Sequence, residues 1–399
     1  MPIPHYSRKF DPSARPIMVD KNQLYKFDRT RGDGQMQLED LVGKDEVDAI
    51  MASGSMEFVV TGDTGNGINS EQEQVVDAMA RDMDVKNPAN GPTFFLSLGD
   101  IIYGPDKAAH YANKFYRPNK SWLQPAPGFK GIILGIPGNH DGEVRDERDK
   151  PSLAAFVENF CQPDGKHPPM AESFGATMAN QPGAYWWLVA PFLDLIGLYS
   201  NAAEDFGILG VDPTDTHQQD WLTQSLKTIA KGRRAGRRRA LVIATHHPPY
   251  NQGFSETESG HPGSPEMLAQ IDKACNDAGV WPDMFLSGHS HNYQYYRRTV
   301  SLTGGQTKII PYLIAGTGGI GSQPVPRNVG AMDKTGTVKY ASGRGSQGRD
   351  NTVYGYLRVR AGSKVVQATF VQALADHRDV VEAVAIDLAT GQETSPDFS

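Results

Sequence analysis

The chain has 399 residues, a formal net charge of −7 at pH 7 and 39% hydrophobic residues. This length allows one large domain or two ordinary ones, and the composition is that of a soluble globular protein. The negative charge excludes a whole-protein attraction to nucleic acid or anionic membranes. No apolar run approaches the roughly 18 residues of a membrane span, so no membrane partner is expected and nucleic acid is disfavoured.

The amino terminus lacks the apolar core of a secretory signal. As written, the sequence therefore predicts a cytoplasmic protein, unless a secretory signal has been trimmed. Residues 1–55 are polar, with one helix predicted over 38–52. We expect them to form an extension that packs on the core or on another subunit, the oligomeric state being open. The sheet is expected to begin at Met56, and the second predicted unit spans 56–399.

The two cysteines are too few for a disulfide framework. Cys161 and Cys275 each lie in an apolar or helical context, which predicts small packed hydrophobes.

Five short apolar runs each lead into a loop that carries Asp, Asn, His or Tyr. The pairs of run and loop residue are 58–60 with Asp63, 94–98 with Asp100 and Tyr103, 132–136 with Asn139 and His140, 241–244 with His246 and His247, and 284–286 with His289 and His291. In a sequence, the buried strands of parallel sheets appear as short apolar runs of this kind. Because ligands in open α/β sheets bind beyond the carboxyl ends of the strands, these side chains are expected to converge.

The pair His289 and His291 shows why a strand end fits better than a helix. Residues two apart do not share a helix face, whereas on an extended strand they point the same way. Gly288 before the pair lets the backbone turn sharply into the loop. One such pair is weak evidence by itself, but four further stretches share its architecture.

The rest of the chain contributes helices, strands and two long loops. Helices are predicted over 70–83, 107–116, 218–230 and 265–278, and strands over 185–189, 192–198, 293–300, 308–315, 354–359, 364–372 and 380–386. Ser70 and Glu73 have the spacing of a capping box. The Gly- and Pro-rich stretches 142–183 and 321–352 are predicted loops, and the first is expected to form a wall or lid over the site.

The basic run 231–239 is the one strong cluster of like charges. It has the charge of a polyanion-binding patch, but it lacks interleaved aromatic residues for base stacking. Because it precedes the strand that ends at His246, it is expected at the opposite end of the sheet from the ligands. A solvated connection between helix and strand is the favoured interpretation.

The predicted ligands are two carboxylates, an amide, three or four imidazoles and a possible phenol. This set suits one or two transition metals better than Mg²⁺ or Ca²⁺, which prefer all-oxygen shells. A paired metal site can bridge a hydroxide and clamp a phosphoryl group. The sequence therefore predicts metal-assisted hydrolysis, with no serine nucleophile required.

The order GDxG, GDxxY, GNHD, a strand-end His followed by proline, and GHxH resembles the calcineurin-like metallophosphoesterases. Within them the chain is similar to the purple acid phosphatase branch. Gly65 stands where most of the superfamily has a metal-binding histidine, and Tyr103 matches the tyrosinate that binds ferric iron in that branch. The resemblance covers about 56–319 together with the carboxyl-terminal hairpin.

The resemblance implies an αββα sandwich of two mixed β-sheets and a centre of two metal ions. Fe³⁺ would occupy the first site, and Fe²⁺, Zn²⁺ or Mn²⁺ the second. The implied ligands are Asp63, Tyr103 and His291 for the first metal, Asn139, His246 and His289 for the second, and Asp100 as the bridge. His140 would contact the phosphoryl oxygens or protonate the leaving group.

Two further histidines are candidates for catalytic roles. The spacing to the proline favours His246 over His247 as ligand, which leaves His247 to support the ligands unless the two exchange roles. His261 lies in the loop 251–263, where the family often places a histidine that contacts the substrate.

The implied reaction is hydrolysis of a small phosphate monoester by in-line attack of a metal-bound hydroxide. The first alternative is a metal-dependent phosphodiesterase that acts on nucleotides or other diesters. A non-catalytic binding protein that keeps the fold, and a nuclease that uses the basic run 231–239, are the remaining alternatives.

Overall fold

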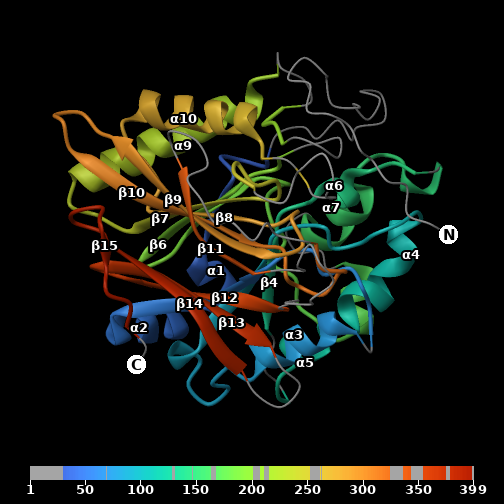
Figure 1. Ribbon diagram of the computed structural model, residues 1–399. Coiled ribbons are helices and arrows are strands. Elements are labelled where there is room, and N and C mark those ends of the chain that lie inside the picture. Colours follow the sequence, from blue (N-terminus) through green and yellow to red (C-terminus); the bar gives the residue numbers. More distant parts are fainter. Residues whose placement is uncertain are drawn as a thin grey trace.

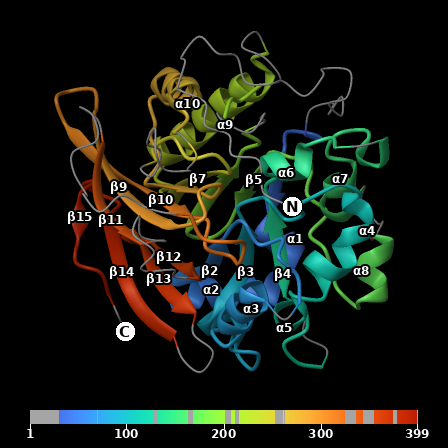
Figure 2. The ribbon, with the colours of Figure 1, turned by 45° about the vertical axis from the view of Figure 1, so that its right-hand side comes forward.

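The computed structural model describes residues 30–397 except 69, 128–130, 146, 163–167, 201–206, 211–214, 252–260, 262, 324–335, 343–353 and 374–377. The predictions for residues 1–29 and for most of the loop 251–263 lie outside the described residues. Two β-sheets face each other, and helices cover both outer faces (Figures 1 and 2). The predicted αββα sandwich is confirmed.

The first sheet has eight strands in the order β1-β5-β6-β7-β8-β10-β9-β11. Strands β6, β7, β8 and β10 run parallel, whereas β5 and β9 pair antiparallel with β6 and β10. The bounds are β1 (Gln35–Gln37), β5 (Trp186–Val189), β6 (Leu193–Gly197), β7 (Ala240–Thr245), β8 (Met284–Ser287), β9 (Tyr293–Ser301), β10 (Thr307–Ala315) and β11 (Gly336–Ser342).

The second sheet has seven strands in the order β15-β14-β13-β12-β2-β3-β4. Strands β2, β3 and β4 run parallel, and the remaining pairs are antiparallel. The bounds are β2 (Ser55–Thr61), β3 (Pro92–Ser97), β4 (Ile132–Gly135), β12 (Gly355–Gly362), β13 (Val365–Ala373), β14 (Arg378–Asp387) and β15 (Glu393–Thr394).

Alternation along the strands builds three apolar layers, because successive strand side chains point to opposite faces. Phe58 and Val60 belong to the core between the sheets, together with Leu286 of the other sheet. Val59 between them packs outward with the helices over the second sheet. On the first sheet, Ile243 likewise packs outward, against the helices that cover that sheet.

Helices form the two outer layers (Figure 1). Over the first sheet lie α9 (His217–Arg234) and α10 (Pro265–Ala278), which contact each other. Over the second sheet and at the site end lie α3 (Glu71–Ala80), α4 (Lys107–Tyr111), a π-helical turn η2 (Ala112–Tyr116), α5 (Lys120–Leu123), α6 (Asn139–Gly142), α7 (Ala154–Phe160) and α8 (Pro169–Ser173). There are also two short 3-10 turns, Pro88–Asn90 and Glu147–Asp149.

The structure corrects several predictions. The helix predicted over 38–52 is two helices, α1 (Leu38–Val42) and α2 (Lys44–Ser53), because Gly43 has a φ of 87°. The sheet does not begin at Met56: β1 joins β5 as a parallel edge strand. Its three residues, Gln-Met-Gln, are too short and polar to give an apolar run.

The two predicted loops contain regular structure. Residues 142–183 include α7 and α8, and 321–352 include β11. Ser70 makes no side-chain cap, since its hydroxyl turns back to the carbonyl of Gly67. The division of the chain at residue 56 stays a prediction.

The basic run lies at the end of the first sheet opposite the strand ends that carry the histidines, as predicted. It closes α9 and leads into β7. Three of its members are held in ion pairs, Arg233 and Arg238 with Asp283 and Arg239 with Asp194. In the part of the chain that the structure describes, no helix is long and apolar enough to cross a membrane.

Candidate metal centre

The carboxyl ends of strands from both sheets meet at one place. Asp63 follows β2, Asp100 follows β3, and Asn139 opens α6 after β4. From the facing sheet, His246 follows β7, and the pair His289 and His291 follows β8. A hydrogen bond from Gly62 N to Ala315 O of β10 (2.9 Å) ties the two sheets together at this end. The predicted convergence is confirmed.

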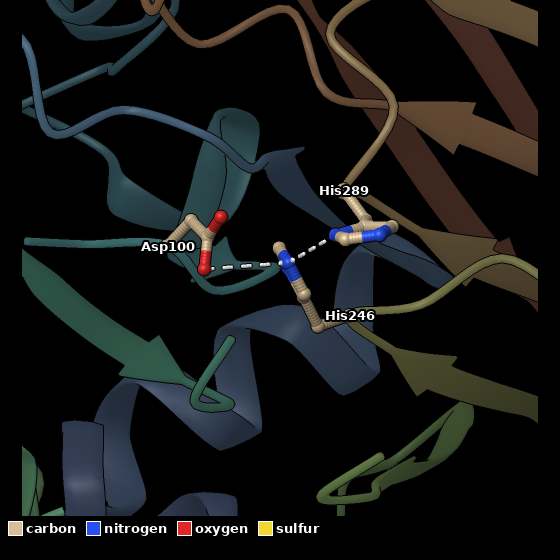
Figure 3. A group of neighbouring side chains, drawn as sticks. All are labelled: Asp100, His246 and His289. Atoms are coloured by element: carbon tan, nitrogen blue, oxygen red, sulfur yellow. Dashed lines mark hydrogen bonds and ion pairs between the residues drawn. The ribbon is translucent and has the colours of Figure 1, made fainter. Parts of the chain in front are cut away.

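Two groups of possible metal ligands form there, and they share one carboxylate. Asp100, His246 and His289 each offer a ligand atom within 4.8 Å of the other two. Figure 3 shows these three side chains pointing toward one another. Asp63, Asp100 and His291 form the second group by the same criterion. Asp100 is therefore common to both groups.

The first group gathers around Nε2 of His246. This nitrogen lies 3.3 Å from Asp100 Oδ1, 3.0 Å from Asn139 Oδ1 and 3.2 Å from His289 Nδ1. The other ring nitrogen, Nδ1, donates to the carbonyl of Leu98 at 2.8 Å. In the neutral imidazole this leaves a lone pair on Nε2, so several acceptor atoms face one another.

The second group shows the same arrangement around His291. Its Nδ1 donates to the carbonyl of Gly321 at 2.9 Å, which turns Nε2 inward. Nε2 lies 3.5 Å from Asp63 Oδ1 and 3.4 Å from the Tyr103 hydroxyl. That hydroxyl is also 3.3 Å from Asp63 Oδ1.

Three residues of the centre hold backbone conformations that favour glycine. The φ values are 59° for Asp63, 53° for Asp100 and 68° for His289. Non-glycine residues rarely occupy this left-handed region, and such strain gathers at functional sites. Backbone hydrogen bonds fix the two carboxylates: His140 N donates to Asp100 (2.9 Å) and His289 N to Asp63 (2.8 Å).

Burial and charge leave the centre electrostatically unbalanced. Burial raises the pKa of Asp63 to about 7, although His246 opposes the rise. Burial acts the same way on Asp100, but the His246 and His140 rings outweigh it and hold the Asp100 pKa well below its ordinary value. Burial and the two carboxylates raise the pKa of the Tyr103 phenol well above its ordinary value. A bound cation would favour both the carboxylate and the phenolate.

His247 and His261 also lie at the centre, but outside both ligand groups. Nδ1 of His247 is 2.7 Å from the Ser200 hydroxyl, and its ring packs 4.2 Å from that of His289. The His261 ring lies 3.9 Å from the His289 ring. His246, not His247, turns a nitrogen toward Asp100.

Asp141 supports the centre, a role that its place in the GNHD motif did not reveal. Its carboxylate accepts hydrogen bonds from the backbone N–H groups of Ile101, Ile102 and Gly138 at 2.8–3.2 Å. It thus shapes the loop that presents Asp100. Glu143, three residues after His140, is a second residue that the sequence analysis passed over. Its i, i+3 spacing, which places side chains on one helical face, was the available signal.

The donor set fits metal ions. Metal-bound imidazoles typically donate the outer N–H to a carbonyl or carboxylate and turn the other nitrogen to the metal. His246 and His291 both do so, through Leu98 and Gly321. Asp63 and Asp100 are buried close together and beside an amide oxygen, so bound cations would stabilise the charged form of both carboxylates.

Comparison with known proteins agrees with this geometry. The family model of the calcineurin-like phosphoesterases matches residues 56–293. No curated protein matches the chain significantly. Among solved structures, the fold is similar to PhoD, with 14% identity and a TM-score of 0.51 over 86% of this chain and 72% of that one. It is also similar to GAP50, the anchor in the inner membrane complex of Plasmodium, with 13% identity and a TM-score of 0.50 over 82% and 88% of the two chains.

The chain belongs to the calcineurin-like phosphoesterase family, because the match spans more than half of its length. Members of this family bind a dinuclear metal centre, and the chain is accordingly a metal-dependent phosphoric ester hydrolase.

Proposed function

We propose that the chain hydrolyses small phosphate monoesters with a purple acid phosphatase-like centre. The observation that carries the proposal is the sharing of Asp100 between two ligand groups that come from both sheets. Two metal ions so held would polarise the phosphoryl group and lower the pKa of a coordinated water, which supplies the nucleophile.

The proposed first site, for Fe³⁺, is held by Asp63, Tyr103 and His291, with Asp100 as the bridge. The proposed second site, for Fe²⁺, Zn²⁺ or Mn²⁺, is held by Asn139, His246 and His289. The Tyr103 hydroxyl supports this division, since it lies 3.3 Å from Asp63 and 3.4 Å from His291. Gly65 complements it, because a Cβ at that position would lie 2.5 Å from Cδ2 of Tyr103.

The remaining histidines would act on the substrate or on the ligands. Nε2 of His140 is 4.0 Å from Asp100 Oδ2, and we assign the ring to the phosphoryl oxygens or the leaving oxygen. We assign His261, whose ring packs on His289, to substrate contact. His247, which is hydrogen-bonded to Ser200, would hold the His289 ring in place.

The assignment of Tyr103 predicts a violet protein. Two metals per chain with iron in the first site should give a broad visible charge-transfer band, since a tyrosinate would donate electron density to Fe³⁺. The measurement is metal content together with the absorption spectrum of the wild type and of Tyr103→Phe, which should keep iron but lose the band. If the band persists in the variant, Tyr103 is not a ligand of the iron. Tyr199→Phe is the matched control, because this tyrosine makes no contact with Asp63 or His291.

A phosphodiesterase that acts on nucleotides or other diesters is the alternative reaction. Phenyl phosphate and diphenyl phosphate distinguish the two, and a clear preference for the diester would exclude our assignment. The anchor described for GAP50 shows that this fold also occurs in a protein named for attachment. The complete ligand pattern argues for catalysis in this chain, since function resides in the site and not in the fold.

A further inference from the structure

The His140 ring connects the metal centre to a carboxylate outside it. Nε2 faces the centre, 4.0 Å from Asp100 Oδ2, and Nδ1 lies 3.2 Å from Glu143 Oε2. The side chains of His140 and Glu143 are 21% and 23% exposed, so the ring is open to substrate on one side. The Tyr103 ring packs 4.5 Å from it.

Glu143 is itself held firmly. Arg145 Nε donates to the same oxygen, Oε2, at 2.6 Å, and Lys107 Nζ donates to the Glu143 carbonyl at 2.5 Å. Lys107 forms a buried ion pair with Asp149 (3.2 Å), whose carboxylate also accepts the backbone N–H of Arg145. The segment that presents Glu143 to His140 is therefore fastened at both the backbone and the side chain.

We propose that Glu143 is a positioning residue for His140, an inference that rests on the proposed phosphomonoesterase function. A neutral imidazole carries one N–H, and an acceptor at Nδ1 fixes both the tautomer and the ring plane. The carboxylate of Glu143 keeps the proton on Nδ1 and directs Nε2 toward the place where the leaving oxygen would sit.

The proton balance of the step is complete. As the bond from phosphorus to the leaving oxygen breaks, that oxygen takes a proton from Nε2 of the doubly protonated ring, and the electron pair stays on Nε2. Water adds its oxygen to phosphorus, and a proton that it releases restores the ring over the turnover. Glu143 keeps its hydrogen bond to Nδ1 throughout and transfers no proton.

The choice of ester separates positioning from general structural support. An alkyl phosphate such as ethyl phosphate needs protonation of its leaving oxygen, whereas 4-nitrophenyl phosphate has a stable leaving anion. We expect Glu143→Ala to lower kcat on ethyl phosphate by about 10- to 100-fold, the usual range for a residue that orients a reacting group. The loss on 4-nitrophenyl phosphate should be about ten times smaller, and KM should change little on either ester.

Two comparisons show whether the effect passes through His140. Glu143→Gln, which keeps an acceptor at Nδ1, should recover part of the loss. In a His140→Ala background, Glu143→Ala should cause no further loss on ethyl phosphate. Glu147→Ala is the matched control, since Glu147 lies in the same segment, is 86% exposed and pairs with Lys150. It should leave both activities unchanged.

A measurement independent of turnover completes the test. In the zinc-loaded protein with ¹⁵N-labelled histidine, His140 should carry its proton on Nδ1 in the wild type and lose that preference in Glu143→Ala. Equal loss of kcat on both esters, or a full effect in the His140→Ala background, would overturn the inference. A wild type inactive on both esters would refute the proposed function, and the tautomer measurement would then decide the role of Glu143 alone.

Discussion

The two ends of the sandwich bury carboxylates in opposite ways. At the carboxyl ends of the strands, Asp63 and Asp100 face imidazole nitrogens and an amide oxygen. At the amino ends, Asp283 pairs with Lys308 and with Arg233 (2.7 Å). Asp194 accepts both Nε (3.0 Å) and Nη2 (2.8 Å) of Arg239. All four carboxylates are buried.

The difference lies in where the positive charge comes from. At the amino ends the chain supplies its own cations, so the buried charges are balanced in the folded protein. At the carboxyl ends, the ion pairs of Asp63 and Asp100 within the described residues are with histidines and not with Lys or Arg. Ions from solution can therefore add positive charge there, and both aspartates have the strained left-handed backbone that gathers at functional sites. One end is therefore expected to serve stability, and the other to serve catalysis.

The largest expected effect comes from neutralising the carboxylate that the two ligand groups share. Because Asp100 belongs to both ligand groups, Asp100→Asn should lower kcat by roughly 10³-fold, the upper end of the cost of removing one electrostatic stabiliser. The metal content per chain should fall as well. Asp277→Asn, on the surface of α10 and paired with Lys273, is the control and should change neither quantity. A loss below about tenfold with both metals retained would contradict the bridging role.

The next effect concerns the opposite end and should leave catalysis intact. Lys308→Met removes a cation from the buried Asp283, and breaking such a pair costs about 3 kcal/mol in the free energy of unfolding. Urea unfolding gives this quantity, and kcat per folded molecule should not change. Lys273→Met, which breaks an exposed pair, should cost less than about 1 kcal/mol. A fall in kcat with unchanged stability would reverse our assignment of the two ends.

The smallest expected effect is a dependence on acid pH. Burial would raise the pKa of Asp283, but Lys308 and Arg233 outweigh it and lower the pKa below its ordinary value. The folded pKa thus lies below the unfolded one, so the contribution of Asp283 to stability is fully present above about pH 4 and is lost as pH falls through the folded pKa. Each unit of displacement corresponds to about 1.4 kcal/mol.

A comparison of wild type with Asp283→Asn isolates this group from the other carboxylates. The difference in unfolding free energy between the two proteins should be constant from pH 6 to about pH 4 and should shrink below it. A difference that stays constant down to pH 3 would show that Asp283 does not titrate as its surroundings require.

The sequence alone was sufficient to place the polar side chains at the strand ends. Each motif lies directly after a buried strand, so its location followed from the apolar run before it, and Asp63, Asp100 and Asn139 needed no tertiary information. The helix α10 begins and ends at the predicted residues, 265 and 278, because Pro265 and Gly279 mark both ends locally. The antiparallel pair β12 and β13 followed from its turn at 361–363.

Only the tertiary structure decided which side chains meet. His246 and His247 are adjacent in sequence, and their roles separate because Leu98 O and Ser200, from distant segments, orient the two rings differently. The strands β1 and β11 were missed because pairing with a sheet edge stabilises them without an apolar run of their own. The hydrogen bond between Glu143 and His140 forms in a segment that Lys107, Arg145 and Asp149 hold in place. Local pattern specifies which groups are present, whereas long-range packing specifies their orientation.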